Sequence, residues 1–256
     1  MSPSKPVFKT EMKKVQIRDC TIFHGDCTEI LPTLPPGSVD LAWTDPPFGI
    51  AYVPNSRKVM AIPDKLINDD KPHLEFVPLI VETVKDGGAV YLCTRFDIAA
   101  QWGNALASTG AKVKNPIYWI KPLPSQGDVT GDRGNCVEIV LFAHVGRHIL
   151  RGKREMNAWM LPRPTALSHP TPKPVELVRR CIQGSSDPGD LVLDPFLGSG
   201  TTAVACALTG RKFIGCEIDE AYFDLSCERI EQAYREIDNR LPGFDPLALE
   251  QGSLFD

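Results

Sequence analysis

A carboxylate, two prolines and an aromatic ring stand at the end of an apolar run in this sequence. Residues 39–43 read Val-Asp-Leu-Ala-Trp, which is typical of a short buried strand, and Asp45-Pro46-Pro47-Phe48 follows one residue later. Because proline fixes the backbone φ angle, the turn can hold the Asp45 carboxylate and the Pro46 carbonyl inward as two hydrogen-bond acceptors. Phe48 adds a flat face beside them. The stretch therefore has the parts of a site, although a plain turn would also use prolines.

A second candidate lies at residues 191–210, which read as a strand, a glycine-rich turn and a helix. Gly198 and Gly200 let the backbone approach a ligand closely, and the free N–H groups at a helix start favour polar or anionic groups. Neither the G-x-G-x-x-G fingerprint nor the Gly-Lys-Ser/Thr of a P-loop is present there. Residues 212–219 form another strand that ends in acids, and Glu217 can accept both hydroxyls of a ribose. For the glycines alone, a plain βαβ turn is the alternative.

Short apolar runs alternate with helical patterns along the chain. Most of these runs show no polar alternation, which is typical of a parallel sheet covered on both faces. This order predicts a doubly wound α/β fold, in which ligands bind beyond the carboxyl ends of the strands. The expected strands are residues 20–24, 39–43, 89–93, 117–120, 137–142, 191–193 and 213–216, and the expected helices are 74–84, 98–107, 174–183, 202–208 and 221–237.

Composition narrows the class of protein. The chain has 256 residues, a formal net charge of −4 and no apolar run near the roughly 20 residues of a membrane helix. Its N-terminus lacks an apolar signal region, so a cytoplasmic location is expected. The eight cysteines form no C-x-x-C pair, which favours buried free thiols over disulfides or a metal site. Basic residues dominate between positions 147 and 180, so the acidic average can hide a basic face.

Four ordered motifs resemble a known family. They are DPPF at residues 45–48, HPTPKP at 169–174, DPFLGSGTT at 194–202 and GCEID at 215–219. Together they resemble the S-adenosylmethionine-dependent DNA amino-methyltransferases, and their order is similar to the circularly permuted beta group. The resemblance implies one Rossmann-like catalytic domain of the class I methyltransferase type over residues 1–256. It also implies a small target-recognition insertion at about 122–168 and a tail at 241–256.

A circularly permuted order constrains which strand lies next to the one that carries Glu217. After the strand that carries Glu217 and the helix at 221–237, no further strand follows, so the next one must come from the N-terminus. Residues 21–26 are the obvious candidate. Asp26 is then expected beside Glu217, at the adenine end of the cofactor, where the family resemblance also puts it.

The resemblance implies a catalytic role for Asp45, Pro46, Pro47 and Phe48. An exocyclic amine is a poor nucleophile because its lone pair is delocalised into the ring. Two acceptors aimed at its N–H bonds can draw the nitrogen towards tetrahedral geometry, while Phe48 stacks on an extruded base. In this family Asp before Pro-Pro usually goes with adenine N6, and Ser with cytosine N4. The first residue of the motif therefore favours adenine.

The resemblance also assigns the cofactor residues. Glu217 would hold the ribose, and Lys173 the methionine carboxylate, where a fixed ammonium suits the task. Pro172 replaces the glutamine that is more frequent before this lysine, so it offers no amide contact. The full set implied for S-adenosylmethionine is Asp26, Cys27, His169, Thr171, Lys173, Asp194, Phe196, Gly198, Ser199, Gly200, Thr201 and Glu217.

Double-stranded DNA is the partner that the resemblance implies. The small insertion predicts a short target, loose specificity or help from a second subunit, which would make a homodimer. Residues 251–255 resemble the peptides that dock on the bacterial sliding clamp, with a tail that folds back on the domain as the alternative. The candidate phosphate or base contacts are Asn55, Arg57, Lys58, Arg133, Arg147, Arg151, Lys153 and Arg154.

Three other functions stay open at this stage. A methyltransferase of the same fold could act on cytosine N4, on RNA or on a protein side chain. A catalytically silent nucleic-acid-binding protein would keep the fold without turnover, against which the intact Asp45 and Glu217 speak. A nicotinamide-dependent oxidoreductase is disfavoured by the missing glycine fingerprint.

Overall fold

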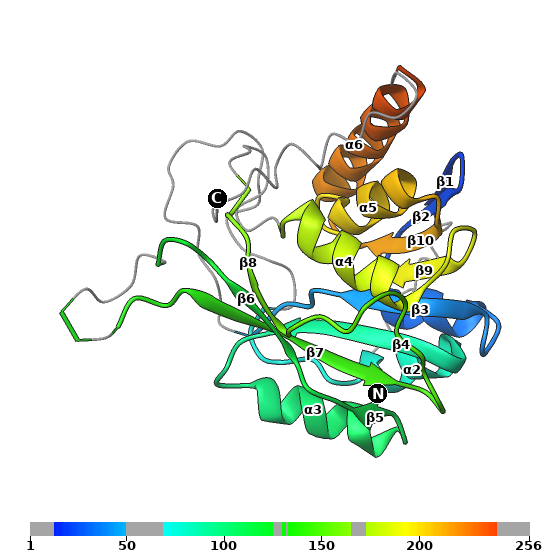
Figure 1. Cartoon of the computed structure of the whole chain (residues 1–256). Coiled ribbons are helices and arrows are strands. Elements are labelled where there is room, and N and C mark those ends of the chain that lie inside the picture. Colours follow the sequence, from blue (N-terminus) through cyan, green and yellow to red (C-terminus); the bar gives the residue numbers. More distant parts are fainter. Residues whose placement is uncertain (1–12, 50–68, 125–129, 132, 165–172, 240–256) are drawn as a thin grey trace, which may run out of the picture.

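One mixed sheet organises the chain. The computed structural model describes residues 13–49, 69–124, 130–131, 133–164 and 173–239 (Figure 1). Ten strands of the described residues join in the order β1-β2-β10-β9-β3-β4-β7-β6-β8, with β5 paired to β7. The strands are β1 (Lys13–Ile17), β2 (Cys20–His24), β3 (Val39–Thr44), β4 (Val84–Thr94), β5 (Lys112–Val113), β6 (Ile117–Ile120), β7 (Val137–His144), β8 (Ala158–Met160), β9 (Leu191–Asp194) and β10 (Lys212–Glu217).

The centre of the sheet is parallel and its two ends are mixed. Strands β2, β10, β9, β3 and β4 all run in the same direction. On one side β1 pairs antiparallel with β2, and on the other β7 pairs antiparallel with β4. The predicted doubly wound, mostly parallel α/β sheet is confirmed.

The N-terminal strand lies where the topological argument expects it. β2 pairs in parallel with β10, and Glu217 at the end of β10 faces His24. The N–H of Gly25 also donates to the carbonyl of Glu217 at 2.8 Å. Strands from opposite ends of the sequence therefore complete one sheet, whereas the circular permutation itself stays a prediction.

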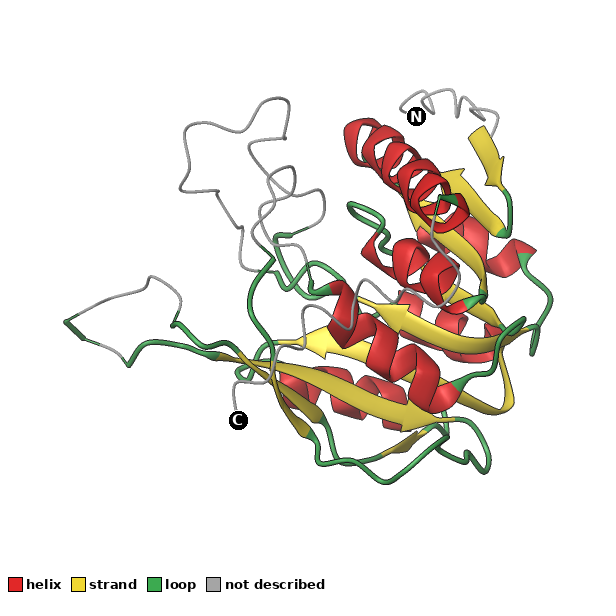
Figure 2. Cartoon of the chain, turned by 45° about the horizontal axis from the view of Figure 1, so that its top comes forward, coloured by secondary structure: helices red, strands yellow, loops and turns green. Residues whose placement is uncertain are grey.

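Helices cover both faces of the sheet (Figure 2). One layer contains α4, α5 and α6, and the other contains α1, α2 and α3, as their mutual contacts show. The helices are α1 (Cys27–Ile30), the 3-10 helix η1 (Leu31–Thr33), α2 (Phe76–Thr83), α3 (Ala99–Ser108), α4 (Val175–Ser185), α5 (Thr201–Thr209) and α6 (Glu220–Asp238).

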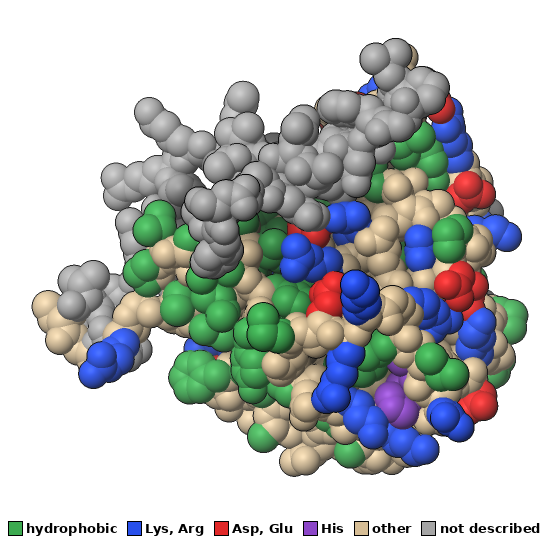
Figure 3. Space-filling view, viewed as in Figure 1, with side chains coloured by type: hydrophobic (Ala, Val, Ile, Leu, Met, Phe, Trp, Pro, Cys, Tyr) green, Lys and Arg blue, Asp and Glu red, His purple; other side chains and the backbone are tan. Residues whose placement is uncertain are grey.

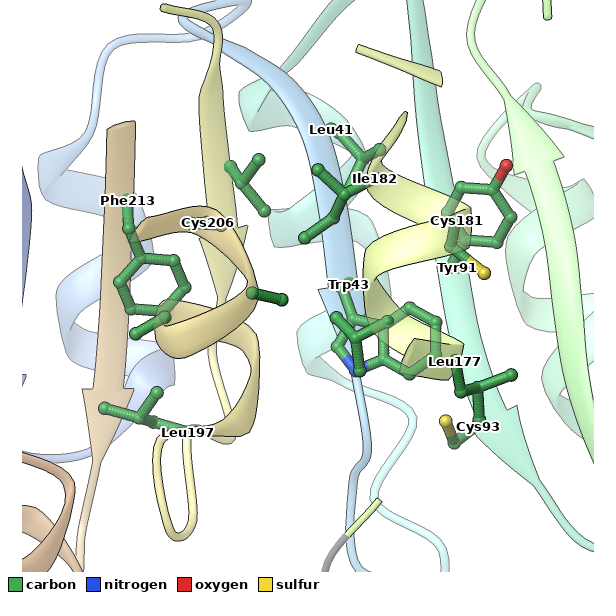
Figure 4. Packing of buried hydrophobic residues seen from close by; sticks show 14 of the residues in the cluster. Leu41, Trp43, Tyr91, Cys93, Leu177, Cys181, Ile182, Leu197, Cys206 and Phe213 are labelled. Carbon is green, nitrogen blue, oxygen red and sulfur yellow. The ribbon is translucent and has the colours of Figure 1, made fainter. Parts of the chain in front are cut away.

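Successive strand residues enter two separate hydrophobic clusters, because side chains alternate across a strand. In β4, Tyr91 packs in the cluster beneath α4, α5 and α6, and Leu92 packs in the cluster beneath α1, α2 and α3. In β3, Trp43 and Ala42 divide in the same way. Figure 4 shows Trp43 and Tyr91 in the first cluster. Burial on both faces explains why these strands lack a polar alternation.

Several short elements were not expected from the sequence. α1 has four residues and β5, β8 and η1 have two or three, too few to give a hydrophobic period, whereas β1 is polar and largely exposed. β4 begins five residues before the expected start, because the pairing of β3 with β4 changes register between Val39 and Leu41. Two glycines there, at 87 and 88, hide the strand in the sequence.

The cysteines agree with the sequence interpretation. All eight are free thiols, and six of them are buried. Within the described part of the chain, His, Cys, Asp and Glu form no group of three that could hold a metal. The described helices are all too short or too polar to span a bilayer.

The second cluster gives a stability prediction. Leu106 on α3 is 1% exposed, whereas Leu150 is 52% exposed. Leu106→Ala should lower the free energy of unfolding by about 2–5 kcal/mol because it leaves a cavity in the core. Leu150→Ala, the matched control, should change it by less than about 0.5 kcal/mol. Urea denaturation followed by circular dichroism measures both, and equal losses would contradict the assigned core.

Candidate active site

The two main motifs emerge side by side from neighbouring parallel strands. Leu41 pairs with Val192 and Ala42 with Leu193, so the ends of β3 and β9 lie next to each other. The carboxyl ends of parallel strands meet at one edge of a sheet. The turn at Asp45 and the glycine loop after Asp194 therefore share this edge, as the motifs require. We call it the site edge.

Asp45 has one carboxylate oxygen engaged and one without a donor. Its Oδ2 accepts from Nζ of Lys173 at 2.5 Å. Its Oδ1 is buried and receives no hydrogen bond from the described residues. Burial raises the pKa of Asp45, and the adjacent Lys173 ammonium opposes that increase. A buried acceptor without a donor is costly, so this oxygen is available to accept a hydrogen bond from a ligand.

Lys173 is the centre of a buried ion-pair chain. Its side chain is 8% exposed. Besides the contact with Asp45, its Nζ lies 3.5 Å from Oε2 of Glu138. Glu138 in turn accepts from Nζ of Lys121 at 2.5 Å. Burial lowers the pKa of Lys173, but the two carboxylates outweigh it and raise that pKa. The same Nζ lies 5.7 Å from the centre of the Phe48 ring.

Gly49 closes the catalytic turn, and sequence reasoning missed its partner. Its N–H donates to Oδ1 of Asp69 at 2.7 Å, and Asp69 is buried. Gly49 has a φ of 74°, and a Cβ there would lie 2.3 Å from the backbone carbon of Lys71. Only glycine fits this approach. The glycine after Pro-Pro-Phe was a signal for a close backbone approach, but no local pattern indicates Asp69.

Asp194 holds the glycine loop in shape. Its Oδ1 accepts from the N–H of Phe196 at 3.0 Å, and its Oδ2 accepts from the Thr202 hydroxyl at 2.5 Å. Burial raises the pKa of Asp194 to about 7. Gly198 and Gly200 have φ values of 54° and 83°, and Gly200 is the N-cap of α5. The loop therefore needs glycine at both positions.

Arg229 on α6 is a further contact that sequence reasoning missed. Its Nη1 donates to the Ser199 hydroxyl at 2.7 Å and also to the Ser199 carbonyl. Burial lowers the pKa of Arg229. The guanidinium therefore fixes the tip of the glycine loop, although Arg229 lies 30 residues after Ser199 in the sequence. A helical arginine gives no such signal in the sequence.

Glu217 ends β10, and Asp26 follows the end of the paired strand β2 by two residues. Glu217 accepts from the N–H of Gly198 at 2.7 Å and from the N–H of Asp219 at 2.9 Å. Burial raises the pKa of Glu217, and these two hydrogen bonds act against it. Oδ1 of Asp26 accepts from the N–H of Thr28 at 2.8 Å and so caps α1. Cys27 is buried behind it, and burial raises the pKa of its thiol to about 12.

Of the other predicted site residues, some lie within the described part of the chain and some lie outside it. Phe196 packs edge-on against Phe76 at a ring distance of 4.6 Å. Thr201 is the first residue of α5 and is buried. His169, Thr171, Asn55, Arg57, Lys58 and the tail residues 251–255 lie outside the described residues.

The predicted basic contacts do not form one group. Arg147 and Arg151 follow the carboxyl end of β7, which faces the start of β4, so they lie at the edge opposite Asp45. Arg151 is paired there with Asp187 at 3.1 Å. Arg133, Lys153 and Arg154 are exposed. The face in Figure 3 shows basic side chains gathered near a histidine, and mainly hydrophobic ones at the end of the sheet with β6 and β8.

Comparisons with known proteins identify DNA methyltransferases as relatives of this chain. The family model described as DNA methylase matches residues 147–228. The chain is 29% identical to the Type II methyltransferase M2.DpnII of Streptococcus pneumoniae over 238 residues, covering 82% of this chain and 89% of the relative. It is also 29% identical to the Type II methyltransferase M.HinfI of Haemophilus influenzae, covering 86% of this chain and 71% of the relative.

A solved structure agrees with these relatives. The M1.HpyAVI–SAM complex superposes with a TM-score of 0.66 at 25% identity, covering 82% of this chain and 99% of that chain. In sequence and in fold, the chain is therefore similar to S-adenosylmethionine-dependent DNA methyltransferases.

Proposed function

We propose that this protein methylates the N6 amine of adenine in DNA by direct transfer to an everted base. One observation carries the proposal: Oδ1 of Asp45 is a buried acceptor that lacks a donor among the described residues. An exocyclic amine has two N–H donors. One would be accepted by this oxygen and the other by the Pro46 carbonyl.

The turn is suited to activating a weak nucleophile. When both N–H bonds are accepted, the amine lone pair is drawn out of the ring and can attack in line. Lys173 holds the other oxygen of Asp45, so the carboxylate has a fixed direction. Phe48, which packs partly against the first hydrophobic cluster, would stack on the base. No covalent intermediate with a cysteine is needed, and the cysteine nearest to Asp45, Cys93, has a pKa well above its ordinary value because it is buried.

The donor set fits S-adenosylmethionine. Ribose hydroxyls need acceptors, and Glu217 presents a carboxylate at the end of β10, where the paired strand β2 leads into Asp26. Residues Asp194, Phe196, Gly198, Ser199, Gly200 and Thr201 would line the methionine side. Lys173 has three N–H donors, and Asp45 and Glu138 account for two. The third would contact the methionine carboxylate with His169 and Thr171. The bound cofactor supplies an electrophilic methyl group.

DNA contacts belong to the same proposal. Arg133 lies in the connection that leaves the β6–β7 pair at the site edge, where a phosphate contact would orient the duplex. Lys153 and Arg154, with Asn55, Arg57 and Lys58, would add phosphate contacts. A homodimer would extend this surface, and the tail at 251–255 would dock on a sliding clamp. We expect the protein to act in the cytoplasm, in a restriction-modification system.

Replacing Asp45 tests the catalytic role. Asp45→Asn should lower kcat by roughly 10²–10⁴-fold because the acceptor loses its charge, as expected for a group that acts on a proton in the transition state. The dissociation constant for S-adenosylmethionine should change less than about threefold, by the same reasoning. Transfer of labelled methyl to DNA, followed by nucleoside analysis, measures the rate and separates N6-methyladenine from N4-methylcytosine.

Asp40→Asn is the control for this experiment. Asp40 is also a partly buried acid in an ion pair, with Lys85, but it lies near the start of β3 at the opposite edge. Asp40→Asn should keep kcat within about twofold of the wild-type value, because the substitution is remote from the reacting atoms. A near-normal rate for Asp45→Asn would remove that residue from the mechanism, and N4-methylcytosine as product would replace adenine as the target.

Replacing Glu217 tests the cofactor assignment. Glu217→Ala should weaken S-adenosylmethionine binding by roughly 10–100-fold, because a charged hydrogen bond contributes about 1.5–3 kcal/mol. Isothermal titration calorimetry measures the affinity directly. Glu220→Gln changes an exposed acid at the start of α6 and should bind normally. An unaltered dissociation constant for Glu217→Ala would contradict the ribose assignment.

A further inference from the structure

Four ionisable side chains form a continuous chain behind the catalytic turn. The order is Asp45, Lys173, Glu138 and Lys121, joined by contacts of 2.5, 3.5 and 2.5 Å. Both lysine side chains are less than one tenth exposed, and both carboxylates are 24% exposed. The four come from different elements: the turn after β3, the residue pair before α4, strand β7 and the end of β6.

Each lysine needs a carboxylate here, because an unpaired buried charge is expensive. Lys173 has two carboxylates, and Glu138 has two ammonium groups. The chain has distinct ends. At one end Oδ1 of Asp45 lacks a donor among the described residues. At the other, Nζ of Lys121 lies 5.1 Å from the centre of the Trp119 ring.

The backbone of Glu138 is anchored in the sheet. It pairs with Trp119 in the β6–β7 ladder, and the N–H of Lys121 donates to the Cys136 carbonyl at 2.7 Å. The Trp119 indole also donates to the Leu161 carbonyl at 2.8 Å. Lys173, by contrast, precedes the first turn of α4 and ends in a long flexible side chain. A fixed carboxylate on the sheet can therefore set the position of that side chain.

We infer that Glu138, fixed by Lys121, is a positioning residue for methyl transfer that holds Lys173 on Oδ2 of Asp45 and so presents Oδ1 to the target amine. This inference rests on the proposed function. It gives a role to the two lysines and the second acid that lie behind a turn whose proposed chemistry needs only one acid. Glu138 touches neither the base nor the cofactor in this scheme, and acts through Lys173.

The charge of Glu138 also affects the ionisation of Asp45. Burial is the main reason why the pKa of Asp45 is raised, Lys173 lowers it, and the Glu138 charge raises it further. Among the described residues, Cys93 on β4 and Asp194 on β9 also interact electrostatically with Asp45. Burial keeps the Cys93 thiol protonated. Asp194 accepts from Thr202 and has a pKa raised to about 7 by burial, so its titration is followed separately from that of Asp45. Removing the Glu138 charge should therefore lower the pKa of Asp45.

Glu138→Gln is the test, because glutamine keeps the size and an acceptor for Lys173. The catalytic carboxylate must be ionised, so a lower pKa moves the acid limb of the kcat–pH profile to lower pH. We expect a shift of roughly half a unit or more, as for the loss of a nearby like charge. At the optimum, kcat should fall roughly tenfold because Lys173 is held less firmly. The KM for DNA should stay within about threefold, since no binding contact is lost.

Two further variants make the result specific. Lys121→Gln should reduce kcat in the wild-type background but by less than about twofold in the Glu138→Gln background, because both act through the same contact. The double variant also carries the pH test if Glu138→Gln alone is unstable. Asp40→Asn, which removes a partly buried paired acid at the opposite edge, should leave the acid limb in place.

The outcomes separate this inference from the proposed function. An unshifted acid limb in Glu138→Gln, or additive losses in the double variant, would overturn the positioning role while wild-type methylation stands. If the wild type methylates no DNA, the proposed function fails. Carbon-13 NMR titration of the Asp45 carboxyl then still decides the inference, since its pKa must fall in Glu138→Gln.

Discussion

The parallel pairing of β3 with β9 is the constraint on which the site depends. The catalytic turn follows one strand and the glycine loop follows the other, although about 150 residues separate them in the sequence. The pairing is buried on both faces, where Trp43 and Val192 meet one helical layer and Ala42 and Leu193 meet the other. Hydrophobic burial therefore fixes the distance between the turn at Asp45 and the glycine loop, and the polar contacts adjust it.

Along the site edge, hydrogen bonds from buried side chains hold the loops in place, because the loops have no regular secondary structure. Asp194 accepts two hydrogen bonds within its own loop, Arg229 reaches that loop from α6, and Asp69 closes the turn at Gly49. Such fixed loops fit a reaction in which orientation supplies much of the rate. The ion-pair chain behind Asp45 does the same for a charged side chain, since it holds the Asp45 carboxylate rather than a loop backbone.

The central sheet could be predicted because its strands are continuous apolar runs. Strands β2 and β6 were expected with their observed bounds, and the position of β2 beside β10 followed from counting strands. Proximity of Asp45 to the glycine loop was also predictable, since parallel strands end at one edge. The short edge strands were not, because two or three residues carry no period.

The side-chain network could not be predicted for a different reason. Lys173 and Asp45 are 128 residues apart, and their contact leaves no local pattern. Glu138 lies within an otherwise apolar run, so it was hidden in a strand that was read correctly as part of the core. Arg147 and Arg151 illustrate the converse. A run of basic residues marks charge in the sequence, but β7 reverses direction and carries them to the other edge.

The pairing of β2 with β10 has a consequence for how the protein is made. β2 spans residues 20–24 and β10 spans residues 212–217, so their pairing forms only after the roughly 190 residues between them have left the ribosome. Such a distant contact slows folding, because most of the chain must be ordered before it forms. Until then β2 and β9 expose unpaired edges, which gives newly synthesised chains an interval of susceptibility to aggregation.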